Sequence, residues 1–375
     1  MEDVLDAFSV EKLSKAFFAS YKQHYQYFCD HLIHSKGYYL SFFNGQDKAI
    51  RDFTKKFLGR IVFLYFLQKK GWLGAKDLNY KDGDKNFMYN LFKKAKSKNI
   101  FYSQWLQQLF FETLNKQREN DDFIMPDGQT LKIPFLNGGL FEKENDKYAG
   151  IDFPEALFTG LFDLFDQYNF TIYEDDPNDH TVAVDPEMLG HIFENLLEDN
   201  KDKGAYYTPK EIVHYMCQES LKEFLSTHLP VIHKDKLDAL IKNSDTNGFS
   251  DDELKEIDLQ IDKVKICDPA IGSGAFPMGL LQEIFSAKQT LHFFEFGTLE
   301  NFNASAVKLN IIQNSVYGVD IEKGAVDIAR LRFWLSLIID EELPKPLPNL
   351  DYKIVEGNSL VSKFEDEVVT IDWSL

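Results

Sequence analysis

The residues best placed to do chemistry lie at positions 265–276. An apolar run predicts a short buried strand that ends at Asp268, and Gly272 and Gly274 then lead into a helical pattern. A strand, a glycine turn and a helix in this order bring backbone N–H groups to a nucleotide-like ligand at the helix N-terminus. Glycine suits the turn because a Cβ atom would hold the backbone away from the ligand and penalise a positive φ. The third glycine of the dinucleotide-binding pattern is missing, so the spacing alone does not define the ligand.

Two further polar residues follow predicted strands downstream. Residues 316–320 predict a second strand, which ends in the acid Asp320, and residues 352–355 predict a third, which leads into Asn358. A helical pattern from Lys323 to about Ile339 separates the two strands. This order predicts a parallel, doubly wound sheet, with ligands at the carboxyl ends of its strands.

Another candidate segment lies upstream of the glycine turn. Thr208 and Glu211 have the spacing of a capping box, with Pro209 expected as the first helical residue. Capping accounts for these three residues, but not for Gly204 or for the adjacent tyrosines at 206–207.

Residues 1 to about 120 predict a helical region. Apolar residues at three- and four-residue steps over 50–64 predict a helix that stops at Gly71. An aromatic stripe over 17–28 has helical spacing, which favours core over a base-stacking surface. A further helix is expected over about 103–116.

Residues 120–180 are rich in turn signals. Asp127 is interpreted as a turn residue, because no Glu-x-Lys follows it to complete a nuclease centre. Asp185 opens a predicted helix with one apolar face. The polar stretches 230–262 and 287–313 are interpreted as helical insertions on either side of the first strand and its helix.

Composition bounds the class of protein. A chain of 375 residues with 15% aromatic residues predicts about two packed domains. The net charge of -19 is uneven, with 20 Lys and Arg against 12 Asp and Glu in residues 1–120, and 21 against 48 in the remainder. The basic part suits nucleic-acid phosphates, and lysines that merely solvate helix faces are an equal alternative.

The sequence does not support a secreted, membrane-bound or metal-binding protein. No signal peptide and no apolar run of about 18 residues is seen, so no membrane association is expected. Three scattered cysteines without a Cys-x-x-Cys pattern fit a reducing cytoplasm. The pair His31 and His34 lacks further ligands, so no metal site is predicted.

The candidate segments resemble motifs of a known enzyme family. Asp-Pro-Ala-x-Gly-Ser-Gly-x-Phe at 268–276 resembles motif I, the S-adenosylmethionine loop, of adenine-specific, amino-group DNA methyltransferases. Gly-Ala-Tyr-Tyr-Thr-Pro at 204–209 resembles motif X, which precedes motif I in the γ-type order. The resemblance implies that Asp320 accepts both ribose hydroxyls of S-adenosylmethionine and that Asn358 contacts its adenine amine. The implied cofactor-binding residues are Tyr207, Thr208, Pro209, Asp268, Pro269, Ala270, Gly272, Gly274, Phe276, Asp320, Ile321 and Asn358.

Each of these assignments has a plainer alternative. Asp320 could cap the helix that follows it, and Asn358 could be an ordinary turn residue. Their order behind motif I favours the cofactor interpretation.

The resemblance extends over about residues 10–360. Residues 57–73 and 136–142 resemble the helical region of large single-chain restriction–modification enzymes, often called type IIG, which join nuclease, methyltransferase and target-recognition parts. The implied fold class is α/β. An all-helical domain with a turn-rich connector (1–180) precedes a partial, doubly wound, Rossmann-like methyltransferase sheet (181–375). Double-stranded DNA is the implied partner.

One departure from the family decides what is expected of this chain alone. The catalytic Asn-Pro-Pro-Tyr motif, which holds and stacks on a flipped adenine, is absent from the 375 residues. Target-recognition and nuclease parts are not recognised either. We therefore expect no catalytic residue here, but the cofactor-binding half of a truncated adenine methyltransferase, inactive by itself. The alternative is a non-catalytic scaffold that binds DNA or a partner and keeps a vestigial cofactor site; RNA or protein methylation is less favoured.

Overall fold

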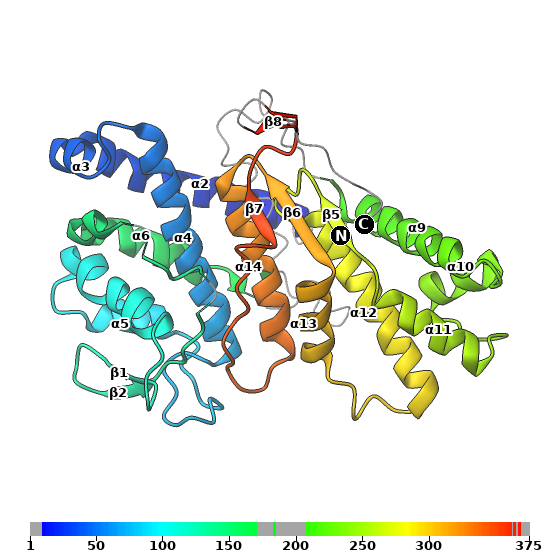
Figure 1. Ribbon diagram of the computed structural model, residues 1–375. Helices are drawn as coiled ribbons and strands as arrows, with labels where there is room; N and C mark the ends of the chain where they lie inside the picture. The colour runs from blue at the N-terminus through cyan, green and yellow to red at the C-terminus, as the bar shows by residue number, and fades with distance from the viewer. Residues whose placement is uncertain are drawn as a thin grey trace, which may run out of the picture.

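The computed structural model consists mainly of helices around a small parallel sheet (Figure 1). The described residues are 10–137, 139–143, 145–170, 183–184, 208–361, 363–364 and 367–368. The helices of residues 36–166 lie on one side of the sheet, and those of residues 210–261 lie on the other (Figure 1). Within the described ranges, no helix has the length and apolar character needed to cross a membrane.

The N-terminal helices pack around one buried helix, α4. They are α2 (Val10–His34), α3 (Lys36–Ser41), α4 (Asp47–Lys70), α5 (Phe87–Lys94) and α6 (Glu155–Asp166). Every residue of α4 from Phe57 to Gln68 is buried, which makes it the core of this region. As predicted, the helix ends at Gly71. That residue has the left-handed φ of 86°, and its N–H donates to the carbonyl of Gln68.

The aromatic stripe of α2 is core, as predicted. Phe17, Tyr21 and Phe28 are fully buried. Phe28 meets Phe153 edge to face, with 4.9 Å between ring centroids. Such contacts stabilise the packing of α2 on its neighbours and leave these rings no face for a nucleic-acid base.

The helix expected over 103–116 has a different geometry. After a 3₁₀ turn, the chain forms two π-type segments (Lys98–Ile100, then Tyr102–Leu106 and Gln108–Leu114). The buried Thr113 hydroxyl donates to the Gln108 carbonyl five residues back, at 2.9 Å, which fits the wider turn.

The turn-rich region contains a hairpin and a helix. Strands β1 (Asp122–Ile124) and β2 (Thr130–Lys132) are antiparallel, and Asp127 lies in their turn as predicted, accepting from the Gln129 N–H at 3.1 Å. After a 3₁₀ segment (Asp146–Gly150), helix α6 follows. Sequence reasoning missed α6, although its buried apolar residues recur at helical spacing.

The parallel sheet predicted from the sequence is present. Its strands are β5 (Ile266–Asp268), β6 (Val316–Asp320) and β7 (Ile354–Glu356), in that spatial order. β7 begins two residues later than expected, because a turn in which Leu350 accepts from the N–H of Lys353 precedes it. Two short pairs complete the described strands: parallel β3 (Asn169–Phe170) with β4 (Ala183–Val184), and antiparallel β8 (Lys363–Phe364) with β9 (Glu367–Val368).

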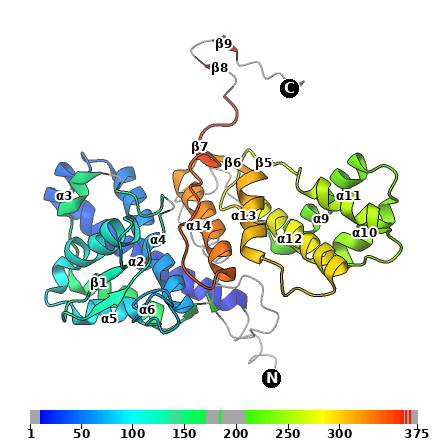
Figure 2. The ribbon, with the colours of Figure 1, turned by 60° about the horizontal axis from the view of Figure 1, so that its bottom comes forward.

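The crossover helices of the sheet lie side by side beneath its strands (Figure 2). They are α12 (Ala275–Phe296), α13 (Ala304–Asn314) and α14 (Lys323–Asp340). The order β7-β6-β5 matches the first half of a doubly wound sheet. The reversal of direction that completes such a sheet does not occur among the described residues.

The prediction of a second helical insertion over residues 287–313 is wrong in part. The helix after the glycine turn continues through residues 287–296 and ends only at Gly297, where φ is 68°. α12 is therefore long, and the segment between it and α13 is short. Its buried Ala287 and Leu291 continue the apolar side of the helix, so polar composition was a poor guide to its end.

Helix α14 joins the sheet to the N-terminal helices. It packs against α4, and Lys70 at the end of α4 donates from Nζ to the carbonyl of Ile339 at 2.6 Å. Burial lowers the pKa of the Lys70 ammonium, and nearby acids such as Asp340 oppose that effect.

The expected capping box at Thr208 and Glu211 is not formed. Helix α9 (Lys210–His228) has Pro209 as its N-cap, with a ψ of 141° and no side-chain cap bond. Proline fixes φ but not ψ, so an extended Pro209 starts the helix one residue later and leaves Thr208 outside it. The helix expected from Asp185 lies outside the described residues.

The first insertion is helical, as predicted. It contains α10 (Lys234–Asn243) and α11 (Asp251–Ile261). A true capping box opens α11, where Ser250 and Glu253 each accept from the other's backbone N–H.

Candidate cofactor site

The glycine turn between β5 and α12 has the backbone geometry that its sequence predicts. Gly272 has a φ of 54° and Gly274 a φ of 88°, both left-handed. A Cβ atom on Gly274 would lie only 3.2 Å from the Cβ of Ala329 in α14. The turn thus needs glycine both for its conformation and for close packing on α14.

Asp320, at the end of β6, ties this turn to the neighbouring strand. Its Oδ2 accepts from the Gly272 N–H at 2.8 Å, and its Oδ1 accepts from the Glu322 N–H at 2.9 Å. The helix that follows has Glu322 as its N-cap, without a side-chain cap bond. Asp320 is therefore not the cap of α14, which was its alternative role.

Two positions that sequence reasoning missed hold the turn in place. The Ile271 N–H donates to the Val319 carbonyl at 2.9 Å, and its side chain covers Gly318 in the middle of β6. A glycine inside a strand often marks such a close approach, so Gly318 carried a readable signal. From α14, the buried Arg332 donates from Nη1 to the Ser273 carbonyl at 3.1 Å, a contact that no spacing rule reveals.

Asp268 places a second carboxyl group at the same edge of the sheet. Its Oδ1 accepts from the Ala270 N–H at 3.0 Å. Burial raises the pKa of the Asp268 carboxyl, with a further rise from the charge of Asp320, while the Ala270 N–H lowers it. Two neighbouring carboxyl groups suit a ligand that offers hydroxyl donors and positive charge.

The remaining predicted residues lie around this edge. Ile321 follows Asp320 and is 66% exposed, an apolar surface at the strand end. Asn358 is exposed, and its Oδ1 accepts from the Leu360 N–H at 3.0 Å, which is the turn role considered as its alternative. Between them, the Gly357 N–H donates to the Asp320 carbonyl at 2.8 Å and joins the ends of β6 and β7.

The other residues of the turn differ in exposure. Pro269 and Ala270 are exposed, while Phe276 is half-buried in the first turn of α12. Upstream, Thr208 is half-exposed, and Pro209 accepts from the backbone of the first turn of α9. Tyr207 lies outside the described residues.

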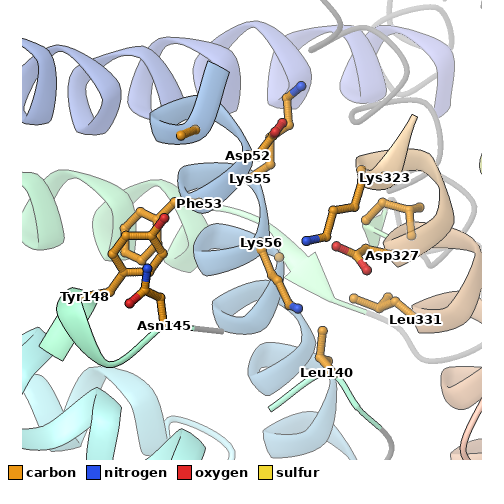
Figure 3. Close-up of a pocket in the computed structure, with 14 residues that line it drawn as sticks. Asp52, Phe53, Lys55, Lys56, Leu140, Asn145, Tyr148, Lys323, Asp327 and Leu331 are labelled. Atoms are coloured by element: carbon orange, nitrogen blue, oxygen red, sulfur yellow. The ribbon is translucent and has the colours of Figure 1, made fainter. Parts of the chain in front are cut away.

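A separate cavity of about 270 Å³, lined by both polar and apolar residues, lies between α4 and α14 (Figure 3). Lysines and acids line it together, with Lys56 from α4 and both Lys323 and Asp327 from α14 directed toward its centre (Figure 3). It is distinct from the glycine turn. Among the described residues, no cluster of three or more His, Cys, Asp or Glu could hold a metal ion.

The arrangement of strands and helices has a counterpart among solved structures. Over 94% of its length, the chain resembles the type IIL restriction-modification enzyme MmeI, solved in complex with DNA, with a TM-score of 0.55 and 16% identity. At this identity the likeness concerns the fold alone: a helix-dominated α/β fold with a small parallel sheet. The chain spans 41% of that protein's length.

A sequence relative points to the same class. Over 347 residues the chain is 29% identical to a putative type II restriction enzyme and methyltransferase of Methanocaldococcus jannaschii. The match covers 86% of this chain but only 28% of the relative. No protein-family model matches. Both similar proteins belong to restriction–modification systems, in agreement with the class expected from the sequence.

Proposed function

We propose that this chain forms the helical and cofactor-binding parts of an adenine-specific DNA methyltransferase of γ-type motif order. Residues 1–180 would be the helical domain, and residues 181–375 the part that binds S-adenosylmethionine. One observation carries the proposal: the glycine turn after β5 is joined through Asp320 to the end of β6, with Asp268 beside it. This edge offers carboxylates to the hydroxyl groups and positive charges of S-adenosylmethionine.

The chemistry of this chain's own residues is binding and orientation. The carboxylates of Asp320 and Asp268 would accept from the ribose hydroxyls and face the cationic groups, and Ile321 would cover the adenine ring. S-adenosylmethionine supplies an electrophilic methyl group, which in the whole enzyme would pass to the exocyclic amine of adenine. The sequence lacks Asn-Pro-Pro-Tyr, so we expect this chain alone to bind the cofactor without catalysing transfer.

Calorimetric titration with S-adenosylmethionine tests the cofactor site. Asp320→Asn replaces the acceptor that meets Gly272 and removes the charge, so we expect affinity to fall roughly 10- to 100-fold, as charged hydrogen bonds predict. Asp235→Asn, at an exposed position of α10, is the matched control and should bind like the unmodified chain. Equal affinity of Asp320→Asn and the unmodified chain would contradict the assignment. Methyl transfer to DNA by this chain alone would contradict the expected inactivity.

The second candidate function is a scaffold that binds DNA or a partner and keeps a vestigial cofactor site. A specific observation favours it: Asp320 already accepts from two backbone N–H groups, and Asn358 accepts within its own turn. Both residues thus have structural roles without a cofactor. Salt-dependent DNA binding by a chain that ignores S-adenosylmethionine would support this alternative.

A further inference from the structure

A buried carboxylate links helices α9 and α12. The Glu283 side chain of α12 is 6% exposed, and its Oε1 contacts Nδ1 of His214 in α9. Gln218, one turn further along α9, also hydrogen-bonds this carboxylate. Burial raises the pKa of Glu283, while the charge of His214 and the hydrogen bonds from Gln218 and His214 lower it. A buried charge needs such partners, because leaving it unpaired is costly.

The two helices also pack closely beside this pair. A Cβ atom on Gly279 of α12 would lie 2.7 Å from Cγ1 of Val213 and 2.9 Å from Sγ of Cys217. Cys217 also contacts the carbonyl of Phe276, at 3.5 Å. All these contacts involve the first three turns of α9 and α12. They therefore determine how the N-terminal ends of the two helices lie relative to each other.

Those N-terminal ends carry the two halves of the proposed cofactor site. α9 begins directly after Thr208 and Pro209, and α12 begins directly after Gly274. A change in the register of α9 on α12 would therefore shift Thr208 relative to the glycine turn. Apolar residues would pack such an interface with less desolvation, whereas an ion pair selects one register.

We propose that Glu283 and His214 are positioning residues of the cofactor site, whose ion pair fixes α9 on α12 and holds the Thr208 segment in place relative to the glycine turn. This inference rests on the proposed function. Several other charged residues of the two helices pair with neighbouring elements. In α9, Lys222 pairs with Asp238 and Glu219 with Lys242. In α12, Lys288 pairs with Asp258 of α11 and with Asp262 just after that helix. Cys217 is a further titratable group that faces Glu283 within the described part of the chain.

The test is calorimetric titration of the whole chain with S-adenosylmethionine from pH 6 to pH 9. Glu283→Gln keeps the shape of the side chain and removes its charge, and we expect roughly tenfold weaker binding at the acidic end of this range. The matched control is Glu223→Gln, which breaks an exposed ion pair of α9 with Lys234 and should change the affinity less than about twofold. Thermal unfolding of each variant shows that it is folded.

The pH profile separates positioning from simple stabilisation. The advantage of the unmodified chain over Glu283→Gln should shrink at the basic end of the range, because an uncharged imidazole can still hydrogen-bond to the carboxylate but no longer forms an ion pair with it. Comparing the two chains cancels the titration of the cofactor's own amine. If Glu283→Gln does not fold, His214→Gln, at the exposed partner, should show the same loss.

The outcomes separate the two proposals. Affinities and pH profiles that match between the unmodified chain and a folded variant, either Glu283→Gln or His214→Gln, would overturn the positioning role and leave the proposed function standing. No binding by the unmodified chain at any pH would overturn the cofactor-binding function, and the positioning role with it.

Discussion

Replacing Gly318 by alanine tests how the glycine turn is seated on the sheet. The added Cβ would lie 2.2 Å from Cδ1 of Ile271, 3.0 Å from Cγ1 and 3.1 Å from Cβ. Carbon atoms in good contact are about 3.5–4.0 Å apart, so the overlap is severe. Because Cβ of Ile271 is also too close, a rotamer change cannot relieve it, and the turn itself must shift.

The expected cost is that of overpacking, about 1–3 kcal/mol of unfolding free energy. Ile271→Val removes Cδ1, the nearest atom, and by itself should cost about 0.5–1.5 kcal/mol. Combined, the two changes should cost less than their sum by at least about 0.5 kcal/mol, because the second deletes the atom with which the first collides. The same shift of the turn should weaken binding of S-adenosylmethionine.

Urea unfolding followed by tryptophan fluorescence measures this coupling, since the buried Trp334 lies in the neighbouring α14. Gly357→Ala is the matched control, because its nearest neighbour would be Cγ1 of Val319 at an ordinary 3.4 Å. A Gly318→Ala chain as stable as the unmodified one, or strictly additive costs in the double variant, would refute the close packing of Ile271 on β6.

Three further predictions concern other parts of the chain. Arg60→Met should cost about 3 kcal/mol in urea unfolding, because the buried guanidinium donates to the carbonyls of Leu140 and Glu142, both at 2.7 Å. Arg51→Met, at a partly exposed ion pair, should change stability by less than about 1 kcal/mol. Equal effects of the two changes would contradict the role of Arg60. Gly71→Ala should destabilise by about 1–2 kcal/mol owing to its left-handed φ, while Gly37→Ala, where a Cβ meets nothing within 4 Å, should not destabilise. In thiol labelling at pH 8, the exposed Cys267 should react well before Cys217, since burial raises the pKa of Cys217 to about 12 and so suppresses its thiolate. Rapid reaction of Cys217 would show that α12 does not cover it.

Local patterns predicted the sheet and its longest helices well. β6 has the predicted bounds, α14 ends within a residue of its expected end, and α4 stops at Gly71. Each of these depends on a signal within a few residues: an apolar run that ends in an acid, a helical period or a glycine. Such signals act through local backbone and burial preferences, which a single sequence displays directly.

The failures have equally physical causes. The box at Thr208 depends on the ψ of Pro209, which proline does not fix. The end of α12 depends on what its apolar side packs against, which composition does not reveal. The candidate site depends on contacts between distant residues, such as Gly272 with Asp320 and Ser273 with Arg332. Spacing rules placed Asp320 at the right edge of the sheet but could not show what its oxygens contact.

Helix α14 extends from the end of β6 to the end of α4. Its first residue lies three positions after Asp320, and its last turn accepts the Lys70 ammonium from the end of α4. A helix resists bending and stretching, so force applied to the N-terminal helices is transmitted along α14 to the strand end that bears Asp320. The glycine turn is attached to the same strand end through the hydrogen bond from the Gly272 N–H to Asp320, so a shift of that strand end would act on this bond. A single helix thus connects the end of α4 with the strand end that bears Asp320.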